Sequence, residues 1–504
     1  MAPAQRTTTL TARLLEAVER YPEREALWAK GISRSYAEFY SHAAAIAARL
    51  INEGVKKGDP VAILCGREVA LYESIFACIL AGAVYTPLNP RFPAERNRAM
   101  LQASSAKALI ADNEHTGAAK ELAPPKLILA DGAATTDKIE TPPLVADDLC
   151  YLLFTSGSTG KPKGVPITYG NVVAYLDGIT ALVPVTCEDR LIQLVDVTFD
   201  LSAHDMFVAW THGAALYSVP ENAAGLAPRF VDDYGLTGWL SVPSTAALAQ
   251  QSGLLTPGSL PTLRFSYFCG EALPDAVAEA WAAAANHSAV YNLYGPTEAT
   301  IAFSHYRFDA ARASRFAIVP IGKPFAGQHM GAFNEKHEQI AAGAIGELYL
   351  AGSQLSPGYW QAPEITAEKF VTLGATRWYR TGDMVRYMED GGFHYVGRAD
   401  QQTKIQGFRV ELAEIEAVLR AVTGRMLVAA VALPPDAQGI TQGVAAFLTG
   451  TPCDASKLTT QLHQHLPHYM VPKQYLFRDA LPLNANGKTD YKALTAQLAI
   501  KEAS

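Results

Sequence analysis

The sequence has few cysteines, no dense charge of one sign and no long apolar run. Its 6 cysteines among 504 residues include no CxxC pair, which excludes a disulfide framework and a zinc site and is typical of a reducing cytoplasm. The net charge is a mild -7, and no Lys/Arg run is interleaved with aromatic residues, so we expect no nucleic-acid partner. The longest apolar stretch, residues 74–88, is shorter than the about 20 residues that cross a bilayer, which favours a buried helix and strand over membrane insertion. Residues 1–24 contain Glu16 and Glu19 and no apolar core, so we expect no signal peptide and a cytoplasmic protein.

Short β-branched runs alternate with Ala- and Leu-rich helical patterns through most of the chain. Helices are predicted at residues 41–50 and 73–80, and buried strands at 60–64, 108–111, 191–194 and 215–219. This alternation predicts an α/β fold, and 504 residues are too many for one core. The clearest boundary is the Gly-Arg-Ala-Asp run at residues 397–400. We therefore predict a large N-terminal domain of packed sheets and helices over residues 1–397 and a small mobile α+β lid domain over 398–504.

The most informative segment follows a predicted strand at residues 149–154. It reads Thr155-Ser156-Gly157-Ser158-Thr159-Gly160-Lys161-Pro162-Lys163-Gly164. Glycines and small hydroxyl residues let backbone N–H groups approach an anion, and Lys161 and Lys163 add positive charge, so the expected ligand is a triphosphate. The segment is not a Walker A loop, because only two residues separate its first two glycines and no Ser or Thr follows Lys161. The alternative, a flexible Gly/Ser linker, requires neither the two lysines nor a preceding buried strand.

Seven segments resemble, in the same order, the motifs of the ANL superfamily of adenylate-forming enzymes. This superfamily contains acyl-CoA synthetases, peptide-synthetase adenylation domains and firefly-type luciferases. The segments are residues 81–96, 151–164, 292–298, 346–352, 379–383, 397–411 and 481–490. The resemblance covers essentially the whole chain. It implies the two-domain fold of the superfamily, the use of ATP with Mg²⁺, and the formation of an acyl-adenylate.

The same resemblance implies a nucleotide site beyond the glycine-rich segment. Tyr294 is expected to stack on adenine, since an aromatic face suits a flat apolar ring, and Asn292 to bond its exocyclic amine, with Leu293 between them. Asp383 is expected to accept hydrogen bonds from both ribose hydroxyls, because a carboxylate accepts through two oxygens. Arg398 is expected to reach the ribose or the phosphate.

Further residues are expected to act on the phosphates and in the lid. By resemblance, Thr297 offers its hydroxyl to the α-phosphate and Glu298 supplies an oxygen ligand for Mg²⁺. Lys488 is expected to place its ammonium between the substrate carboxylate and the α-phosphate, where a cation offsets the repulsion of two anions. Asp400 occupies the hinge position about which the lid rotates between two half-reactions, and Gly407 resembles the residue lining a phosphopantetheine tunnel. The alternative for Lys488 is a surface lysine.

The carboxylate substrate is indicated by Phe199-Asp200-Leu201-Ser202, which resembles the FDxS motif of amino-acid-activating members. A buried ammonium must be paired, so an aspartate at position 200 predicts an amino acid and argues against a fatty or aryl acid. A helix-capping role for Asp200 is the alternative. Carried over position by position, the substrate pocket consists of Asp200, Leu201, His204, Ser241, Tyr267, Cys269, Gly270, Leu293, Ile301 and Ala302, with Lys488 at its mouth.

The pocket residues favour a small side chain. Residues 268–273 resemble the segment of D-alanine:carrier-protein ligases in which a cysteine lies beside the substrate methyl group, and Tyr267 and Leu293 fill space. His204 and Tyr267 depart from those ligases and place an additional polar group near the substrate, and a purely structural role for His204 is equally open. Alanine of either hand is the first prediction, with serine, glycine, threonine, cysteine and proline behind it.

The acceptor is expected to be a thiol. The sequence contains no GG[HD]S-like phosphopantetheine attachment site, so we expect a free-standing ligase that loads a separate phosphopantetheinylated carrier protein, with coenzyme A as the competing acceptor. Two other functions stay open: an acyl-CoA or aryl-CoA ligase for an organic acid without an amine, and a non-catalytic nucleotide-binding protein. The joint presence of Lys488, Glu298, Asp383 and both loop lysines speaks against the last of these.

Overall fold

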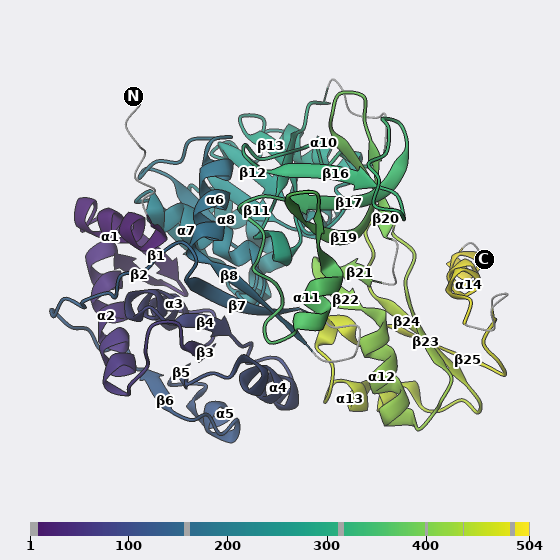
Figure 1. The fold of residues 1–504 in the computed structure, drawn as a ribbon, viewed down its shortest axis with the longest axis horizontal. Helices are drawn as coiled ribbons and strands as arrows, with labels where there is room; N and C mark the ends of the chain where they lie inside the picture. Colours follow the sequence, from purple (N-terminus) through teal and green to yellow (C-terminus); the bar gives the residue numbers. More distant parts are fainter. Residues whose placement is uncertain are drawn as a thin grey trace.

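The chain folds around two large sheets, with a third sheet and a small domain beside them (Figure 1). The structure is a computed structural model, and it describes residues 9–155, 162–310, 317–398, 402–436, 438–483 and 489–502. Three groups of predicted site residues lie outside the described residues: 156–161 of the glycine-rich segment, the hinge residue Asp400, and Lys488.

The first large sheet has six strands in the order β6-β5-β3-β4-β7-β8, and all neighbours are parallel except β7 and β8. Its strands are β3 (Pro60–Leu64), β4 (Val84–Pro87), β5 (Ala108–Asp112), β6 (Leu127–Ala130), β7 (Leu149–Thr155) and β8 (Lys163–Thr168). Every residue of β3, β4 and β5 is buried, as expected of parallel strands covered on both faces. The strands predicted at 60–64, 108–111 and 149–154 are confirmed.

The second large sheet has nine strands in the order β15-β14-β13-β12-β11-β9-β10-β1-β2. They are β1 (Glu25–Ala29), β2 (Ile32–Ser35), β9 (Arg190–Gln193), β10 (Ala215–Ser218), β11 (Gly238–Ser241), β12 (Phe265–Phe268), β13 (Ala289–Tyr294), β14 (Ser304–Arg307) and β15 (Lys323–Pro324). Because β11, β12 and β13 are parallel neighbours, their carboxyl ends meet at one edge of the sheet. The strands predicted at 191–194 and 215–219 are β9 and β10.

Helix α3 (Val69–Ala81) lies between the two large sheets and contacts strands of both, β3, β4 and β5 on one side and β1 on the other. All of its residues except Ala70 are buried, which a helix that is apolar on every side requires. The apolar stretch at residues 74–88 is therefore this helix followed by β4, as the sequence predicted. Among the described residues, no helix combines the length and the apolar character that crossing a membrane requires.

Among the described residues, ten more helices belong to the large domain, and the last of them packs on the third sheet. They are α1 (Leu10–Arg20), α2 (Tyr36–Asn52), α4 (Ala94–Ser104), α5 (Thr116–Glu121), α6 (Tyr169–Thr180), α7 (Leu201–Thr211), α8 (Ala227–Tyr234), α9 (Pro243–Gln251), α10 (Asp275–Ala284) and α11 (Pro363–Lys369). Helix α2 contains the helix predicted at 41–50 and begins with a reciprocal capping box between Ser35 and Glu38. Short 3₁₀ turns occur at Glu221–Leu226, Thr297–Ala299 and His468–Met470.

The third sheet leads directly into the small domain. It is antiparallel and contains β16 (His329–Phe333), β17 (Ile345–Ala351), β18 (Phe370–Leu373), β19 (Thr376–Tyr387) and β20 (Phe393–Arg398). The small domain contains the hairpin β21 (Gln402–Ile405) and β22 (Phe408–Glu411), the strands β23 (Val428–Ala432), β24 (Val444–Thr449) and β25 (Gln474–Arg478), and the helices α12 (Leu412–Thr423), α13 (Ala455–Leu462) and α14 (Tyr491–Glu502). The predicted α/β fold with a large and a small domain is confirmed. The boundary between 397 and 398 stays a prediction, and β20 ends there.

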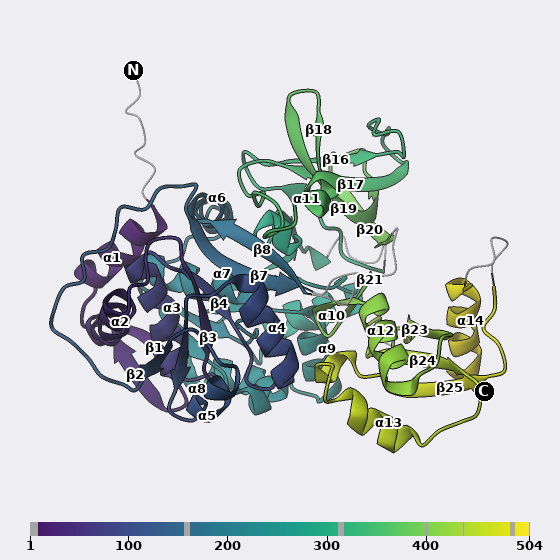
Figure 2. The same cartoon turned by 60° about the horizontal axis from the view of Figure 1, so that its bottom comes forward.

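The small domain turns its β21–β22 hairpin toward the large domain, whereas α14 lies on its far side in both views (Figure 2). Two of the ion pairs that cross the junction come from α4: the Arg96 guanidinium lies 2.6 Å from the Glu414 carboxylate, and the His465 ring lies 3.0 Å from Glu95. The Arg96 and Glu414 side chains are only 9% and 4% exposed, so this pair belongs to a packed interface. Phe92 of the large domain joins the apolar core of the small one.

Candidate active site

A cavity lies where β11, β12 and β13 end and where the β21–β22 hairpin meets them. Ligands of α/β sheets bind at the carboxyl ends of the strands. The cavity is lined by residues of both domains, including Lys404, Gly407 and Arg409 of the hairpin. It brings together eleven of the predicted site residues: Thr155, Asp200, Leu201, Ser241, Cys269, Gly270, Tyr294, Thr297, Ile301, Asp383 and Arg398.

Asp200 supplies a buried carboxylate that has no ion-pair partner among the described residues. It stands at the N-cap position of α7, directly before Leu201, but its side chain makes no capping hydrogen bond, which argues against the helix-capping alternative. Its Oδ2 accepts a hydrogen bond from the Ile301 backbone N–H at 3.3 Å, and the Thr297 hydroxyl also donates to it. Burial raises the pKa of Asp200 to about 6, because desolvation disfavours the charged form. A cationic ligand would remove that penalty.

The wall opposite Asp200 is formed by the ends of β11 and β12. The Ser241 hydroxyl donates to the Val242 carbonyl at 3.0 Å and accepts from the Trp239 indole at 2.9 Å, so its hydrogen bonds are satisfied within the wall. Burial raises the pKa of the Cys269 thiol to about 12, which keeps the thiol neutral. Cys269 therefore acts as a small apolar wall and not as a nucleophile.

His204 and Tyr267 lie one layer deeper, behind the residues that line the cavity. His204 follows Asp200 by four residues and so lies one helical turn below it, and Tyr267 precedes Cys269 by two residues on β12. The two rings meet edge to face, with centroids 5.4 Å apart and planes at 88°. Neither residue, nor Ala302, lines the cavity, and all three are almost completely buried. They lie behind the lining residues as its floor, and direct contact of His204, Tyr267 or Ala302 with the substrate stays a prediction.

The sequence analysis missed Tyr175, which holds this floor in place. Its hydroxyl lies 2.7 Å from Nδ1 of His204 and has no other hydrogen-bond partner among the described residues, so it donates its proton there. Burial lowers the pKa of His204 to about 3, and the ring is neutral in the working range. His204 therefore adds no charge to the pocket. Tyr175 lies on α6, 29 residues before its partner, where no motif singles it out.

A second cavity adjoins the first and has the features of an adenine site. It is lined by Gly270, Asn292, Leu293, Tyr294 and Arg398, among others. The Asn292 amide donates to the carbonyls of Val319 at 3.1 Å and Pro320 at 2.9 Å, which fixes its orientation. Its Oδ1 is buried and has no hydrogen-bond partner in the described parts of the chain. A buried acceptor without a partner is costly, and the exocyclic amine of adenine is the donor that would satisfy it.

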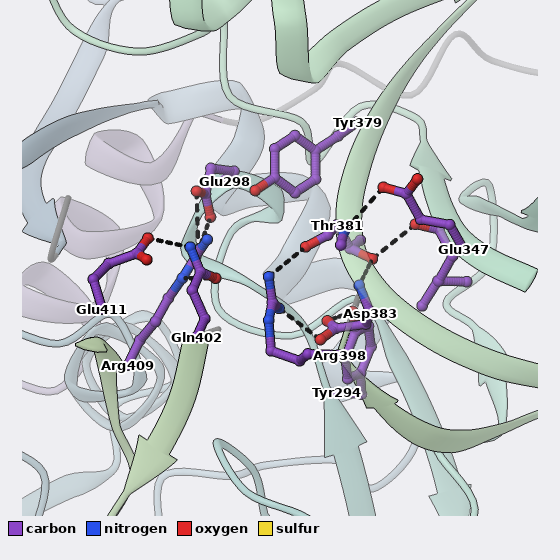
Figure 3. Close-up of polar contacts among 12 residues, drawn as sticks. Tyr294, Glu298, Glu347, Tyr379, Thr381, Asp383, Arg398, Gln402, Arg409 and Glu411 are labelled. Atoms are coloured by element: carbon purple, nitrogen blue, oxygen red, sulfur yellow. Dashed lines mark hydrogen bonds and ion pairs between the residues drawn. The ribbon is translucent and has the colours of Figure 1, made fainter. Parts of the chain in front are cut away.

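Asp383 lies beside this cavity with both oxygens directed at neighbours (Figure 3). The Tyr294 hydroxyl donates to Oδ2 at 2.5 Å, and the Arg398 guanidinium donates to Oδ1 at 2.6 Å and to the Thr381 carbonyl at 3.2 Å. Carboxylate oxygens accept more than one hydrogen bond each, so Asp383 retains capacity for two ribose hydroxyls. Tyr294 is thereby held with its ring at the cavity.

Glu298 is the candidate ligand for Mg²⁺ and is only 1% exposed. No group of three or more His, Cys, Asp or Glu side chains in the described parts of the chain is placed to hold a metal ion. This fits Mg²⁺ in nucleotide sites, which takes one or two carboxylates and completes its shell with phosphate and water oxygens. Tyr359 donates to Oε1 of Glu298 at 2.7 Å, and the Arg409 guanidinium lies 3.0 Å from both oxygens (Figure 3). Burial lowers the pKa of nearby Lys163, the described lysine of the predicted phosphate segment.

Comparison with known proteins identifies the family. Residues 14–360 match the AMP-binding enzyme family, and residues 414–488 match the AMP-binding enzyme C-terminal domain. The chain belongs to the AMP-binding enzyme family. Membership of this family confirms the prediction of an adenylate-forming ligase that uses ATP.

Four relatives place the chain within the family. Enterobactin synthase component F of Escherichia coli (strain K12) is 35% identical over 97% of the chain, and surfactin synthase subunit 2 of Bacillus subtilis (strain 168) is 34% identical over 95%. The chain spans only 39% and 13% of these two proteins. A crystal structure of the Vibrio cholerae adenylation domain AlmE in complex with glycyl-adenosine-5'-phosphate is 35% identical, with a TM-score of 0.90 and coverage of 98% of each chain. NpsA-ThdA of Klebsiella oxytoca, an artificially fused adenylation-PCP di-domain, is 27% identical, with a TM-score of 0.82 and coverage of 93% of each chain.

Replacing Asn292 by leucine tests the adenine site. The Asn292→Leu variant lacks the buried acceptor, so we expect the preference for ATP over inosine triphosphate, which has no exocyclic amine, to fall by about tenfold. Pyrophosphate exchange with each nucleotide measures that ratio. An unchanged ratio, with ATP and inosine triphosphate losing rate equally, would show that Asn292 only braces the 319–320 backbone.

Replacing Tyr175 by phenylalanine tests the floor of the pocket. Loss of the hydroxyl leaves His204 Nδ1 without its donor, so the ring loses its fixed position and we expect selectivity for small over large amino acids to fall about tenfold. The matched control is Tyr36→Phe, which removes another buried hydroxyl, bonded to the Ala214 carbonyl at 2.7 Å and remote from the cavity. Both variants should lose similar thermal stability, and only Tyr175→Phe should change the ratio of the exchange rates with small and with large amino acids. Equal ratios in the two variants would contradict the assignment.

Proposed function

We propose that this protein activates a small amino acid, glycine or alanine, with ATP and transfers the aminoacyl group to the phosphopantetheine thiol of a carrier protein. The observation that carries the proposal is the buried Asp200 carboxylate, which has no ion-pair partner among the described residues and lines the cavity. A substrate α-ammonium supplies the missing charge, because a buried carboxylate is stable only when it is paired. A fatty or aryl acid has no such group and would leave Asp200 uncompensated.

In the first step, the substrate carboxylate attacks the α-phosphorus of ATP and pyrophosphate leaves. Asp200 holds the ammonium end, so the carboxylate end points toward Thr297, whose hydroxyl is already in contact with Asp200. Asn292, Tyr294 and Asp383 hold the adenosine. Lys488 would place its ammonium between the two reacting anions, and loss of one such contact typically costs on the order of 10²–10³ in rate. Mg²⁺ on Glu298 would neutralise phosphate charge.

The depth of the pocket supports a small substrate. Cys269 and Ile301 line it next to Asp200, and the His204–Tyr267 floor closes it one layer below. Alanine was the first prediction from the sequence. Glycine joins it because AlmE, which is similar over nearly the whole chain, holds glycyl-adenosine-5'-phosphate. Serine, threonine, cysteine and proline need more room and are expected to react more slowly.

In the second step, a thiol attacks the carbonyl carbon of the mixed anhydride, AMP leaves, and a thioester forms. A carrier-bound phosphopantetheine thiol is the proposed acceptor, supported by the pairing of an adenylation domain with a PCP in NpsA-ThdA. Coenzyme A presents the same thiol and is the alternative acceptor. Closure of the site matters in both steps, since water hydrolyses the anhydride.

A pyrophosphate-exchange screen tests the function directly. Glycine, both enantiomers of alanine, larger amino acids and simple organic acids are compared, and we expect exchange to depend on glycine or alanine. Asp200→Ala should abolish it by removing the partner of the ammonium. Exchange with amine-free acids, or full amino-acid affinity in Asp200→Ala, would overturn the proposal in favour of an acyl-CoA or aryl-CoA ligase.

The pKa of Asp200 predicts how substrate affinity depends on pH. The free enzyme holds this carboxyl with a pKa of about 6, and only the ionised form pairs with an ammonium. The KM for the amino acid should therefore be constant above about pH 7 and rise about tenfold per unit as the pH falls below that pKa. The KM for ATP measured over the same range is the internal control. A flat amino-acid KM between pH 5 and about pH 7 would contradict the role of Asp200.

A further inference from the structure

The β21–β22 hairpin is inserted between the two predicted ligand sites in this structure. The Gly407 backbone N–H donates to the Glu271 carboxylate at 2.7 Å, and the Phe408 ring meets Phe199 edge to face with centroids 4.5 Å apart. A Cβ at position 407 would lie 2.3 Å from the Val242 side chain, so only glycine allows this approach. The hairpin is therefore seated against the walls of the substrate cavity.

This insertion brings Arg409 to the carboxylate that is expected to bind Mg²⁺. One guanidinium nitrogen of Arg409 lies 3.0 Å from each Glu298 oxygen. Its Nε donates to Gln402 at 3.1 Å, which holds the side chain along the hairpin (Figure 3). The Glu298 side chain is 1% exposed and that of Arg409 is 22% exposed, so the pair is largely removed from water. Its charges compensate each other without a metal ion.

We propose that Arg409 and Mg²⁺ are alternative partners of Glu298, so that the hairpin inserts only after the metal has left with pyrophosphate. A metal ion bound at about 2.1 Å from a carboxylate oxygen would occupy the space that the guanidinium takes. Both cations together would also place three positive charges against one negative charge in a region of low dielectric. Arg409 is thus a positioning residue for the thioester step, in which no pyrophosphate remains to be neutralised. The inference deepens the proposed function and rests on it for the order of the two steps.

Other contacts of the same arrangement show that Arg409 is not its only support. The Arg96–Glu414 pair and the edge-to-face Phe92–Tyr469 ring pair, with centroids 6.4 Å apart, join the same two domains. These contacts do not involve Glu298. They supply a control: losing them weakens insertion of the hairpin without changing how Glu298 is neutralised.

The experiment measures the position of the small domain without any amino acid. Spin labels are placed on Cys453, which is exposed, and on a cysteine introduced at exposed Gln102, in a Cys187→Ser background that removes the other accessible thiol. Pulsed electron paramagnetic resonance gives the distance distribution with pyrophosphate and EDTA, and again with pyrophosphate and excess Mg²⁺. We expect one main distance with EDTA, matching this structure, and its loss when Mg²⁺ is present. A distance distribution that is the same with and without Mg²⁺ would overturn the proposal.

A double variant, in which Glu298 also loses its charge, makes the test specific for the Arg409–Glu298 pair. Arg409→Gln leaves Glu298 buried and bare, so the population at the inserted distance should fall at least about tenfold with EDTA. Adding Glu298→Gln removes the bare charge and should restore that population, with no response to Mg²⁺. Arg96→Gln should also reduce insertion, but Glu298→Gln should not rescue it. Rescue of both variants, or of neither, would overturn the pairing of Arg409 with Glu298.

These distances are read without substrate turnover, so their outcome is independent of the exchange screen. Failure of exchange with amino acids, together with the expected distances, would remove the proposed substrate and leave the Arg409 switch intact. Amino-acid-dependent exchange, together with a distance that is the same with and without Mg²⁺, would support the proposed substrate and overturn the Arg409 switch.

Discussion

A carboxylate that is removed from water needs a partner for its charge, and three such carboxylates organise this site. Asp383 has Arg398 at 2.6 Å, and Glu298 has Arg409 at 3.0 Å, so both are compensated by the protein itself. Asp200 has only a hydroxyl and a backbone N–H among the described residues, and its pKa rises to about 6 as a consequence. Of these three carboxylates, Asp200 is the one without an ion-pair partner among the described residues, and a substrate ammonium would complete it.

The two arginines that compensate the other carboxylates flank the predicted hinge residue, Asp400. Arg398 is the last residue of β20, and Arg409 lies on β22 of the hairpin. Rotation about a hinge between them would leave Arg398 with the large domain while moving Arg409. The ribose site can therefore persist through a lid movement, whereas the environment of Glu298 must change. A carboxylate that alternates between a metal ion and a guanidinium stays neutralised in both arrangements, which avoids the several kcal/mol that a bare buried charge costs.

Much of this organisation could be predicted from the sequence, because it is carried by short segments. The strand before Thr155, the apolar helix at 69–81 and the convergence of Asp200, Cys269, Tyr294 and Asp383 on one cavity all follow from local patterns and motif order. Partnerships between distant residues could not be predicted. Arg409 lies in a recognised motif, but nothing local shows that it meets Glu298, 111 residues away, or that Arg96 meets Glu414, 318 residues away. Such pairs depend on how two domains are oriented, which periodicity and spacing do not encode.

The same distinction explains why the substrate class was easier to infer than the substrate. In the proposed function Asp200 recognises a charge, and an ionic contact discriminates strongly, since a ligand without the ammonium would leave a buried carboxylate unpaired. The pocket below it recognises volume, where one methylene group is worth only about 1–3 kcal/mol. Rejection of larger side chains therefore requires that the residues behind the pocket keep fixed positions. The Tyr175–His204 hydrogen bond fixes that floor, and the neutral state of His204 lets the ring pack against Tyr267 without a charge to solvate. Cys269 is a small residue of the cavity wall, and under the proposed function the aromatic layer behind it would favour glycine and alanine over longer side chains.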